Sequence, residues 1–185
     1  DDCEGLIPPY LRFVKGIIDT DDIDLNVSRE MLQNNPVVAK IKSAIIKRVI
    51  SELKKKANKD PEEFAKFWDA FGAVLKEGIH EDFTNRDKIL EVCRFKSSES
   101  DKLISLDDYV SRMKDGQEKI YYVSGEDENK LSQSPHLEGF KAKGIEVIYM
   151  TDPVDEFWLP SVGKFSEKDF QSITKGGADL DKIKS

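Results

Sequence analysis

The segment LNVSREMLQNNPVV, residues 25–38, places two side chains that could do chemistry in a short polar stretch, directly before a strongly amphipathic run. Arg29 carries a planar, permanently charged guanidinium, which can donate two parallel hydrogen bonds to phosphoryl oxygens, and a lysine cannot reproduce that fork. Gln33 follows four residues later, so in a helical conformation both side chains would lie on one face. The other interpretation is a surface salt bridge between Arg29 and Glu30 or Asp24, and the residues alone favour it.

Beyond this segment, the chain contains no motif that indicates a complete enzyme. It has no phosphate-binding P-loop, no dinucleotide-binding glycine motif, no nucleophile elbow and no HExxH zinc motif. The acidic pairs at residues 21–22 and 107–108 are explained by a polar turn and by the first turn of a helix. His80 and His136 lie in separate segments without a second ligand at metal spacing, so we expect no metal site.

Length and composition indicate a globular protein with a packed core. The 185 residues are 38% hydrophobic and 35% charged, which supplies enough apolar side chains for a core in one large domain or two small subdomains. The net charge of -7 opposes general binding to nucleic acid, because such binding requires a basic face. We therefore expect no nucleic-acid partner.

The chain carries no signal for a membrane or for secretion. Its amino terminus, DDCEGLIPPY, is acidic where a signal peptide is basic and then apolar, and no apolar run approaches the roughly 20 residues of a bilayer span. Cys3 and Cys93 form no CxxC pair, so neither a disulfide framework nor a thiolate metal site is expected. These features favour a reducing cytoplasm. The absent initiating Met and the ending TKGGADLDKIKS are typical of a fragment of a longer protein.

Hydrophobic periodicity predicts three successive helices in the first half of the chain. From Pro36, apolar residues recur about every four positions and predict a long helix, whose opposite face is rich in lysine. The apolar stripe consists of Val37, Ile41, Ile45, Val49 and Leu53, with Val38 and Ile46 beside it. A second helix has Asp60 as N-cap, Pro61 in its first turn and Gly78 just beyond its end. A shorter third helix is predicted over residues 85–92.

After Ser105 the pattern changes to strands that alternate with helices. The predicted strands are KIYYVSG, IEVIYMTD and FQSIT, at residues 119–125, 145–152 and 170–174, and Asp152 is the predicted cap of the helix that precedes the third. Such alternation is typical of right-handed parallel βαβ units. The predicted fold is therefore α/β: a remnant of a sheet-and-loop subdomain, a three-helix connector, and a small α/β/α subdomain with a parallel sheet.

Three stretches of the chain closely resemble the middle domain of the heat-shock protein 90 chaperones. They are YLRFVKGIIDTDDIDLNVSREMLQ, SLDDYVSRMKDGQEKIYYVSG and SPHLEGFKAKGIEVIYMTDPVDEF, and the resemblance runs from about Glu4 to Thr174. The ending DEFWLPSVGKF is similar to the bacterial, HtpG-like form rather than to the eukaryotic cytosolic one. Members of the family are ATP-driven dimeric chaperones with a nucleotide-binding amino-terminal domain, a middle domain and a carboxyl-terminal dimerisation domain.

The resemblance implies a role for the opening segment. LNVSREMLQ corresponds to the family's catalytic loop, in which Arg29 reaches the terminal phosphate of ATP bound in the preceding domain and Gln33 assists. ATP with magnesium is then a cofactor of the full-length protein, and neither binding nor ATPase activity is expected of this fragment alone. The implied partners are unfolded or partly folded client proteins, the amino-terminal domain of the same chain, and a second copy in a homodimer. The alternative function is a free-standing α/β interaction module with a basic helix.

The resemblance also implies a division of the chain. Residues 1–35 would end the larger α/β subdomain and include the catalytic loop, and residues 36–93 would form the helical connector. Residues 94–175 would form the small α/β/α subdomain, and residues 176–185 a linker towards the dimerisation domain.

Residues Glu156, Phe157 and Trp158 form a candidate site for client proteins. The two aromatic residues are adjacent on a predicted helix and point about 100° apart, so a helix lying on a sheet fully buries only one of them. We expect the other to stay partly exposed beside Glu156, in an acidic and apolar patch of the kind that holds partly unfolded proteins weakly. In the alternative, a neighbouring domain or the SVGKF segment covers both rings.

Overall fold

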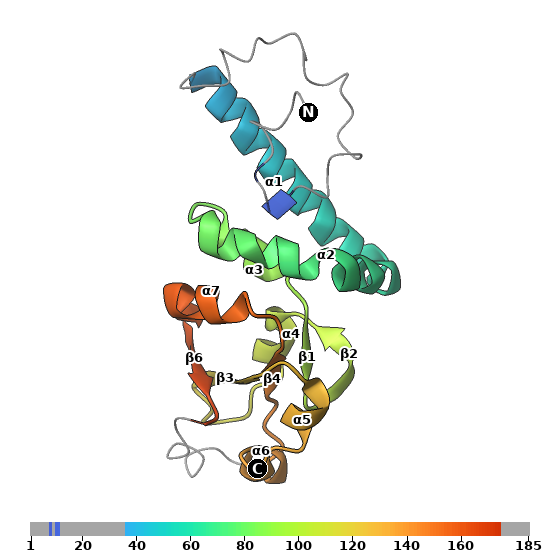
Figure 1. Cartoon of the computed structure of the whole chain (residues 1–185), viewed down its shortest axis with the longest axis vertical. Helices are drawn as coiled ribbons and strands as arrows, with labels where there is room; N and C mark the ends of the chain where they lie inside the picture. Colours follow the sequence, from blue (N-terminus) through green and yellow to red (C-terminus); the bar gives the residue numbers. More distant parts are fainter. Residues whose placement is uncertain (1–7, 9, 12–35, 175–185) are drawn as a thin grey trace.

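The computed structural model of the chain describes residue 8, residues 10–11 and residues 36–174. The helices in this part are α1 (Pro36–Lys59), α2 (Pro61–Glu81), α3 (Arg86–Val92), α4 (Leu106–Ser111), α5 (Glu128–Ser132), α6 (Leu137–Ala142) and α7 (Asp155–Val162). The strands are β1 (Phe95–Ser97), β2 (Ser100–Ile104), β3 (Lys119–Ser124), β4 (Ile148–Met150), β5 (Lys164–Phe165) and β6 (Lys168–Ser172). Figure 1 shows α1 at one end, α2 and α3 in the middle, and the sheet with its remaining helices beyond them.

The strands form one mixed sheet in the order β2-β1-β4-β3-β6-β5. Its three central strands are parallel, with Tyr122 opposite Ile148 and Ile120 opposite Phe170. These are the three strands that the sequence predicts, so the parallel βαβ arrangement is confirmed. The strands β1, β2 and β5 were not predicted; they flank the parallel centre and pair antiparallel with their neighbours.

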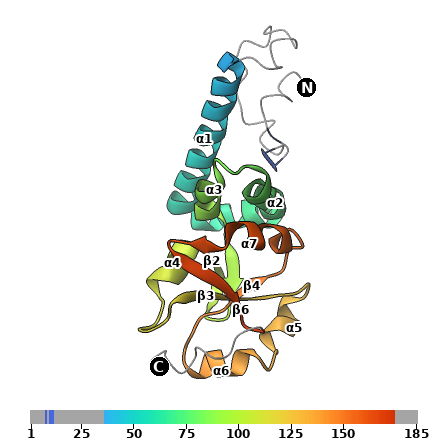
Figure 2. The same cartoon turned by 90° about the vertical axis from the view of Figure 1, so that its left-hand side faces the viewer.

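Helices cover both faces of the sheet (Figure 2). On one face α5 and α6 enclose a small core of Tyr121, Val123, Leu137, Phe140, Ile145, Val147, Tyr149 and Ile173. On the other face α7 lies between the sheet and the helices α2 and α3. Successive residues of β3 follow the pleat, since Ile120 belongs to the core on the α7 face and Tyr121 to the core on the α6 face.

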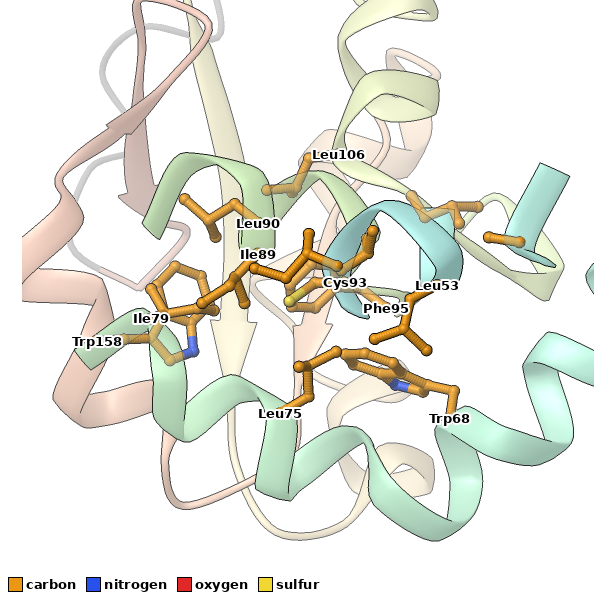
Figure 3. Packing of buried hydrophobic residues seen from close by; sticks show 14 of the residues in the cluster. Leu53, Trp68, Leu75, Ile79, Ile89, Leu90, Cys93, Phe95, Leu106 and Trp158 are labelled. Carbon is orange, nitrogen blue, oxygen red and sulfur yellow. The ribbon is translucent and has the colours of Figure 1, made fainter. Parts of the chain in front are cut away.

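The larger core is continuous from the long helices to the sheet. It unites residues of α1, α2 and α3 with residues of the strands and of α7, and Figure 3 shows Leu53, Leu75, Ile89, Phe95 and Trp158 converging around Cys93. The predicted connector and the predicted small subdomain therefore share one core. Relative motion of the two would expose apolar surface and is opposed by the hydrophobic effect.

The buried face of α1 differs from the predicted stripe. Its buried residues are Val38, Ile46, Ile50, Leu53 and Ala57, whereas Val37 is 61% exposed. A strict spacing of four residues rotates by about 40° per step around a helix of 3.6 residues per turn, so the predicted stripe drifts off the face. The observed positions 46, 50, 53 and 57 follow the helical period and keep to one side.

Side-chain caps begin α2 and α4, and the one at Asp60 confirms the predicted start of α2. The Asp60 carboxylate accepts a hydrogen bond from the Glu63 amide at 3.2 Å. Ser105 and Asp108 form a reciprocal capping box, each side chain accepting from the other's amide. These short polar side chains satisfy amides that the first turn of a helix leaves without an intrahelical partner.

The predicted end of α2 at Gly78 is wrong, because the helix continues through this residue to Glu81. The reason for the glycine is steric. A Cβ at Gly78 would come within 2.5 Å of the ring of Tyr10, which is buried against the helix and whose hydroxyl donates to the Asp82 carboxylate. Gly78 thus permits a close approach and does not terminate the helix.

This approach makes Gly78→Ala a destabilising substitution even though alanine favours helix. We expect the free energy of unfolding to fall by about 1–3 kcal/mol through overpacking. Gly139→Ala, on an exposed position of α6, is the control and should be neutral or stabilising by up to about 1 kcal/mol. Urea unfolding followed by tryptophan fluorescence measures both, and equal effects of the two substitutions would contradict the steric explanation.

Candidate functional site

The predicted catalytic residues Arg29 and Gln33 lie outside the described residues, and their proposed roles remain predictions. The described part of the chain resumes at Pro36, where α1 begins. The second predicted site, at residues 156–158 on α7, lies wholly within the described part and can be examined directly.

The two adjacent aromatic residues of α7 have opposite environments. Trp158 is fully buried, with 0% of its surface exposed, whereas Phe157 is 63% exposed. Glu156 is also exposed. The expectation that one ring is buried and the other exposed is confirmed. In this structure Glu156 and Phe157 are available to a partner, and Trp158 acts from within the core.

Trp158 is fixed by both its polar and its apolar contacts. Its indole Nε1 donates to the Asp155 carboxylate at 2.8 Å, which satisfies the one polar atom of the ring. The ring lies 6.2 Å from Phe95 of β1 and meets the edge of Phe170 of β6 at 5.6 Å, measured between ring centroids. These contacts set the rotation of α7, and the same rotation turns Phe157 outwards because its neighbour points about 100° away.

The start of α7 differs from the prediction that Asp152 caps it. The helix begins at Asp155, and Val154 occupies the cap position without a side-chain bond. The Asp152 carboxylate instead accepts from Lys76 Nζ at 2.9 Å, while Asp155 accepts from the Asp152 amide at 3.1 Å. The buried ammonium of Lys76 requires carboxylate partners. Asp152 therefore accepts a hydrogen bond from Lys76 and does not cap the helix.

Lys76 of α2 is the centre of this cluster. Its side chain is 4% exposed, and Nζ lies 3.0 Å from the Asp155 carboxylate, which is fully buried. Nζ also lies 4.9 Å from the ring centroid of Phe95 and 5.8 Å from that of Trp68, within the range of cation-π attraction. The ammonium thus joins the long helix α2 to the beginning of α7.

Burial and charge oppose each other at Lys76. Burial by itself lowers the pKa of this lysine, but the carboxylates of Asp155 and Asp152 raise the pKa above its ordinary value. Lys76 is therefore charged at neutral pH. Nearby, burial raises the pKa of the Cys93 thiol to about 12, so this cysteine stays protonated and lacks the thiolate character of a reactive residue.

The roles of Lys76 and Asp155 could not be predicted from the sequence. The available signal was positional, since Lys76 follows Leu75 within the apolar arc of α2 that also contains Trp68 and Ile79. A lysine at that place needs an acidic partner, but the partners lie 76 and 79 residues further along the chain. Without the fold, sequence spacing could not select them among 36 acidic residues.

Other features of the described part do not define a competing site. A groove of about 790 Å³ between the start of α2, the β1–β2 hairpin and α5 is lined by four basic and four acidic side chains, and two of them, Lys96 and Glu128, pair at 2.9 Å. Its charges therefore select no ligand of either sign. Among the described residues, no cluster of three or more histidine, cysteine or acidic side chains could hold a metal. None of the helices described is long and apolar enough to traverse a bilayer.

Comparison with known proteins places this chain in a family. A family model described as Hsp90 protein matches residues 1–185. Chaperone protein HtpG of Paramagnetospirillum magneticum is 56% identical over 185 residues, and that of Roseobacter denitrificans is 58% identical over 183. These matches cover 100% and 99% of this chain but 30% of each relative.

A solved structure matches the fold as well. The middle domain of a putative heat shock protein from Plasmodium falciparum has a TM-score of 0.71 and 33% sequence identity, over 78% of this chain and 61% of that chain. The mixed sheet with its long leading helices is thus the fold of a molecular-chaperone middle domain. The chain belongs to the Hsp90 protein family, among whose bacterial HtpG members it spans 30% of the full length.

The buried ion pair of Lys76 leads to a stability prediction with a matched control. Lys76→Met leaves Asp155 as an uncompensated buried charge and should lower the free energy of unfolding by about 3–5 kcal/mol. Lys54→Met removes a pair of the same length, Lys54 to Glu91 at 3.0 Å, but with both side chains partly exposed, and should cost less than about 1 kcal/mol.

Urea unfolding of the two variants measures the difference. Trp68 and Trp158, the only tryptophans of the chain, both lie in the core beside Lys76 or Asp155 and report the transition by fluorescence. Similar midpoints for the two variants would show that burial does not set the strength of the Lys76 pair.

Proposed function

We propose that this chain is the part of an ATP-dependent chaperone that completes ATP hydrolysis in a neighbouring domain and offers surface to client proteins. The match to the Hsp90 family along the entire chain carries this proposal. The full-length protein would be a homodimer in the cytoplasm, with ATP and magnesium bound by its amino-terminal domain. The alternative of a free-standing interaction module has no comparable support, since the relatives at 56–58% identity are chaperones.

Arg29 would act on ATP from outside the nucleotide-binding domain. Its guanidinium can donate two parallel hydrogen bonds to the oxygens of the terminal phosphate, where negative charge spreads during transfer. Gln33, four residues further on, would assist from the same polar segment. This chain has no P-loop or other phosphate-binding glycine motif of its own, so ATP binding itself is assigned to the preceding domain.

A substitution in the full-length protein tests this assignment. Arg29→Ala should lower ATP turnover by at least about tenfold while nucleotide affinity stays nearly unchanged, because the interaction forms chiefly in the closed transition state. Arg29→Lys keeps the positive charge but cannot donate two parallel hydrogen bonds, so it should restore only part of the ATP turnover. Steady-state ATPase rates and calorimetry with a non-hydrolysable ATP analogue separate the two effects, and an equal loss of affinity would reject the assignment.

Client binding is assigned to Glu156 and Phe157, with Trp158 as the buried anchor of their helix. The supporting observation is an exposed aromatic ring on a helix whose rotation is fixed by a buried tryptophan and a buried carboxylate. A rigidly presented ring loses little conformational entropy on binding, which favours contact with apolar side chains of partly unfolded proteins.

The corresponding variant replaces the exposed ring alone. Phe157→Ser in the full-length protein should weaken binding of an unfolded model client, reduced and carboxymethylated α-lactalbumin, by roughly fivefold or more. Basal ATPase activity and thermal stability should stay unchanged, because the ring contributes little to the core. Phe71→Ser is the control: it removes a partly exposed ring on α2 that is not part of the proposed client site, and it should leave client binding intact. Unchanged binding by Phe157→Ser, or a collapse of its thermal stability, would reject the client site.

A further inference from the structure

A second exposed ring lies beside the proposed client site. Phe83, in the turn between α2 and α3, is 79% exposed, and together with Phe157 it is the most exposed large hydrophobic residue described. Burial of a phenylalanine is favourable, and a short polar turn has no need of one. The exposure of both rings therefore suggests a function outside the core.

A series of contacts connects the two rings into one surface. The guanidinium of Arg86 stacks on the Phe83 ring at 4.7 Å, and its Nη1 donates to the carbonyl of Ser161 on α7 at 3.2 Å. Ser161 and Phe157 are four residues apart and thus lie on the same side of α7. Phe157 in turn lies 6.3 Å from the ring of His80 on α2. We call this set, Phe83, Arg86, Phe157 and Ser161, the two-ring surface.

Arg86, at the middle of this surface, has more N–H donors than its hydrogen bonds within the chain use. Its Nε donates to the carbonyl of Ile79, and with the bond to Ser161 this accounts for two of the five N–H groups of a guanidinium. Within the described part of the chain, Arg86 forms no ion pair with a carboxylate. The remaining N–H groups can therefore donate to acceptors on a partner.

The charges around the two-ring surface oppose an acidic partner. Glu81 and Asp82 directly precede Phe83, and Glu156 directly precedes Phe157, so the single guanidinium is outnumbered. An uncharged acceptor is the better complement to Arg86, and the main-chain carbonyls of an extended polypeptide are such acceptors. A folded partner offers few free main-chain carbonyls, because most of them already accept hydrogen bonds within its own fold.

The geometry also sets the spacing of the apolar groups that the surface can hold. The Phe83 ring lies 4.7 Å from Arg86, Arg86 lies 3.2 Å from the Ser161 carbonyl, and Phe157 is one helical turn of about 5.4 Å from Ser161, so the two rings are separated by a distance on the order of 15 Å. An extended chain advances about 3.3 Å per residue and presents alternate side chains on one side, so residues i and i+4 are about 13 Å apart and face the same way.

We infer that the two-ring surface binds an extended, uncharged segment of an unfolded polypeptide with two apolar side chains four residues apart, one on Phe83 and one on Phe157. Arg86 donates to a main-chain carbonyl of the segment between them. This inference rests on the proposed client site and extends it from α7 across to the α2–α3 turn.

Labelled peptides test the inference on the full-length protein by fluorescence anisotropy. The probe peptide has two leucines four residues apart among serine, glycine and glutamine. One comparison peptide has the leucines adjacent, and another has a glutamate midway between spaced leucines. We expect the spaced peptide to bind at least about threefold more tightly than either comparison peptide, and stronger binding of the glutamate peptide would overturn the choice of an uncharged segment.

Variants of the protein locate the binding. Phe83→Ser and Phe157→Ser should each weaken binding of the spaced peptide by about fivefold or more, whereas Phe71→Ser should not. Phe83→Leu keeps an apolar side chain but loses the stack on Arg86, so restored binding in this variant assigns the effect to apolar contact. Thermal melting should be unchanged in Phe83→Ser, because the ring is exposed.

The outcomes separate this inference from the proposed client site. If Phe157→Ser weakens binding and Phe83→Ser does not, the two-ring surface is rejected and the site on α7 stands. If neither substitution has an effect, both are rejected. If both weaken binding but adjacent and spaced leucines bind equally, the bridging of the rings by one extended segment is rejected.

Discussion

The structure depends on one buried charge, the ammonium of Lys76, and on the two carboxylates that hold it. Burial of an unpaired ammonium would cost several kcal/mol, a large share of a domain's net stability, and the fold offsets this cost by bringing Asp152 and Asp155 to the lysine. This pairing joins a residue of α2 to the end of β4 and the start of α7. Trp158 completes the cluster by donating to Asp155, and its ring then closes the core between α7 and the sheet.

The same cluster connects stability to the surface that faces a partner. Because Asp155 and Trp158 occupy the buried side of α7, Phe157 has only the solvent side left, and its exposure follows from the packing of its neighbours. Arg86 fixes the other end of α7 by binding the Ser161 carbonyl. A helix held at both ends presents its exposed ring with little freedom to lose on binding.

The sequence was sufficient where local signals decide the structure. The cap at Asp60 and the three predicted segments that became β3, β4 and β6 could be recognised from neighbouring residues. It was insufficient where distant residues decide. The sequence predicts a helix end at Gly78, but the glycine is needed for the close approach of Tyr10. It predicts a helix cap at Asp152, but that carboxylate accepts a hydrogen bond from Lys76. The flanking strands β1, β2 and β5 are short and too polar to show an apolar period.

The shared core of the long helices and the sheet has a mechanical consequence. The 24 residues of α1 extend for about 36 Å, and α1 packs on α2 and α3 within the core that these helices share with the sheet, while the ion pair of Lys76 ties α2 to α7. Such a unit behaves as a lever. A rotation of only about 5° at its sheet end would carry the first turn of α1 through roughly 3 Å, the length of one hydrogen bond. Residue 35 is covalently attached at that turn, so a small change of angle at one end would suffice to make or break a polar contact at the other.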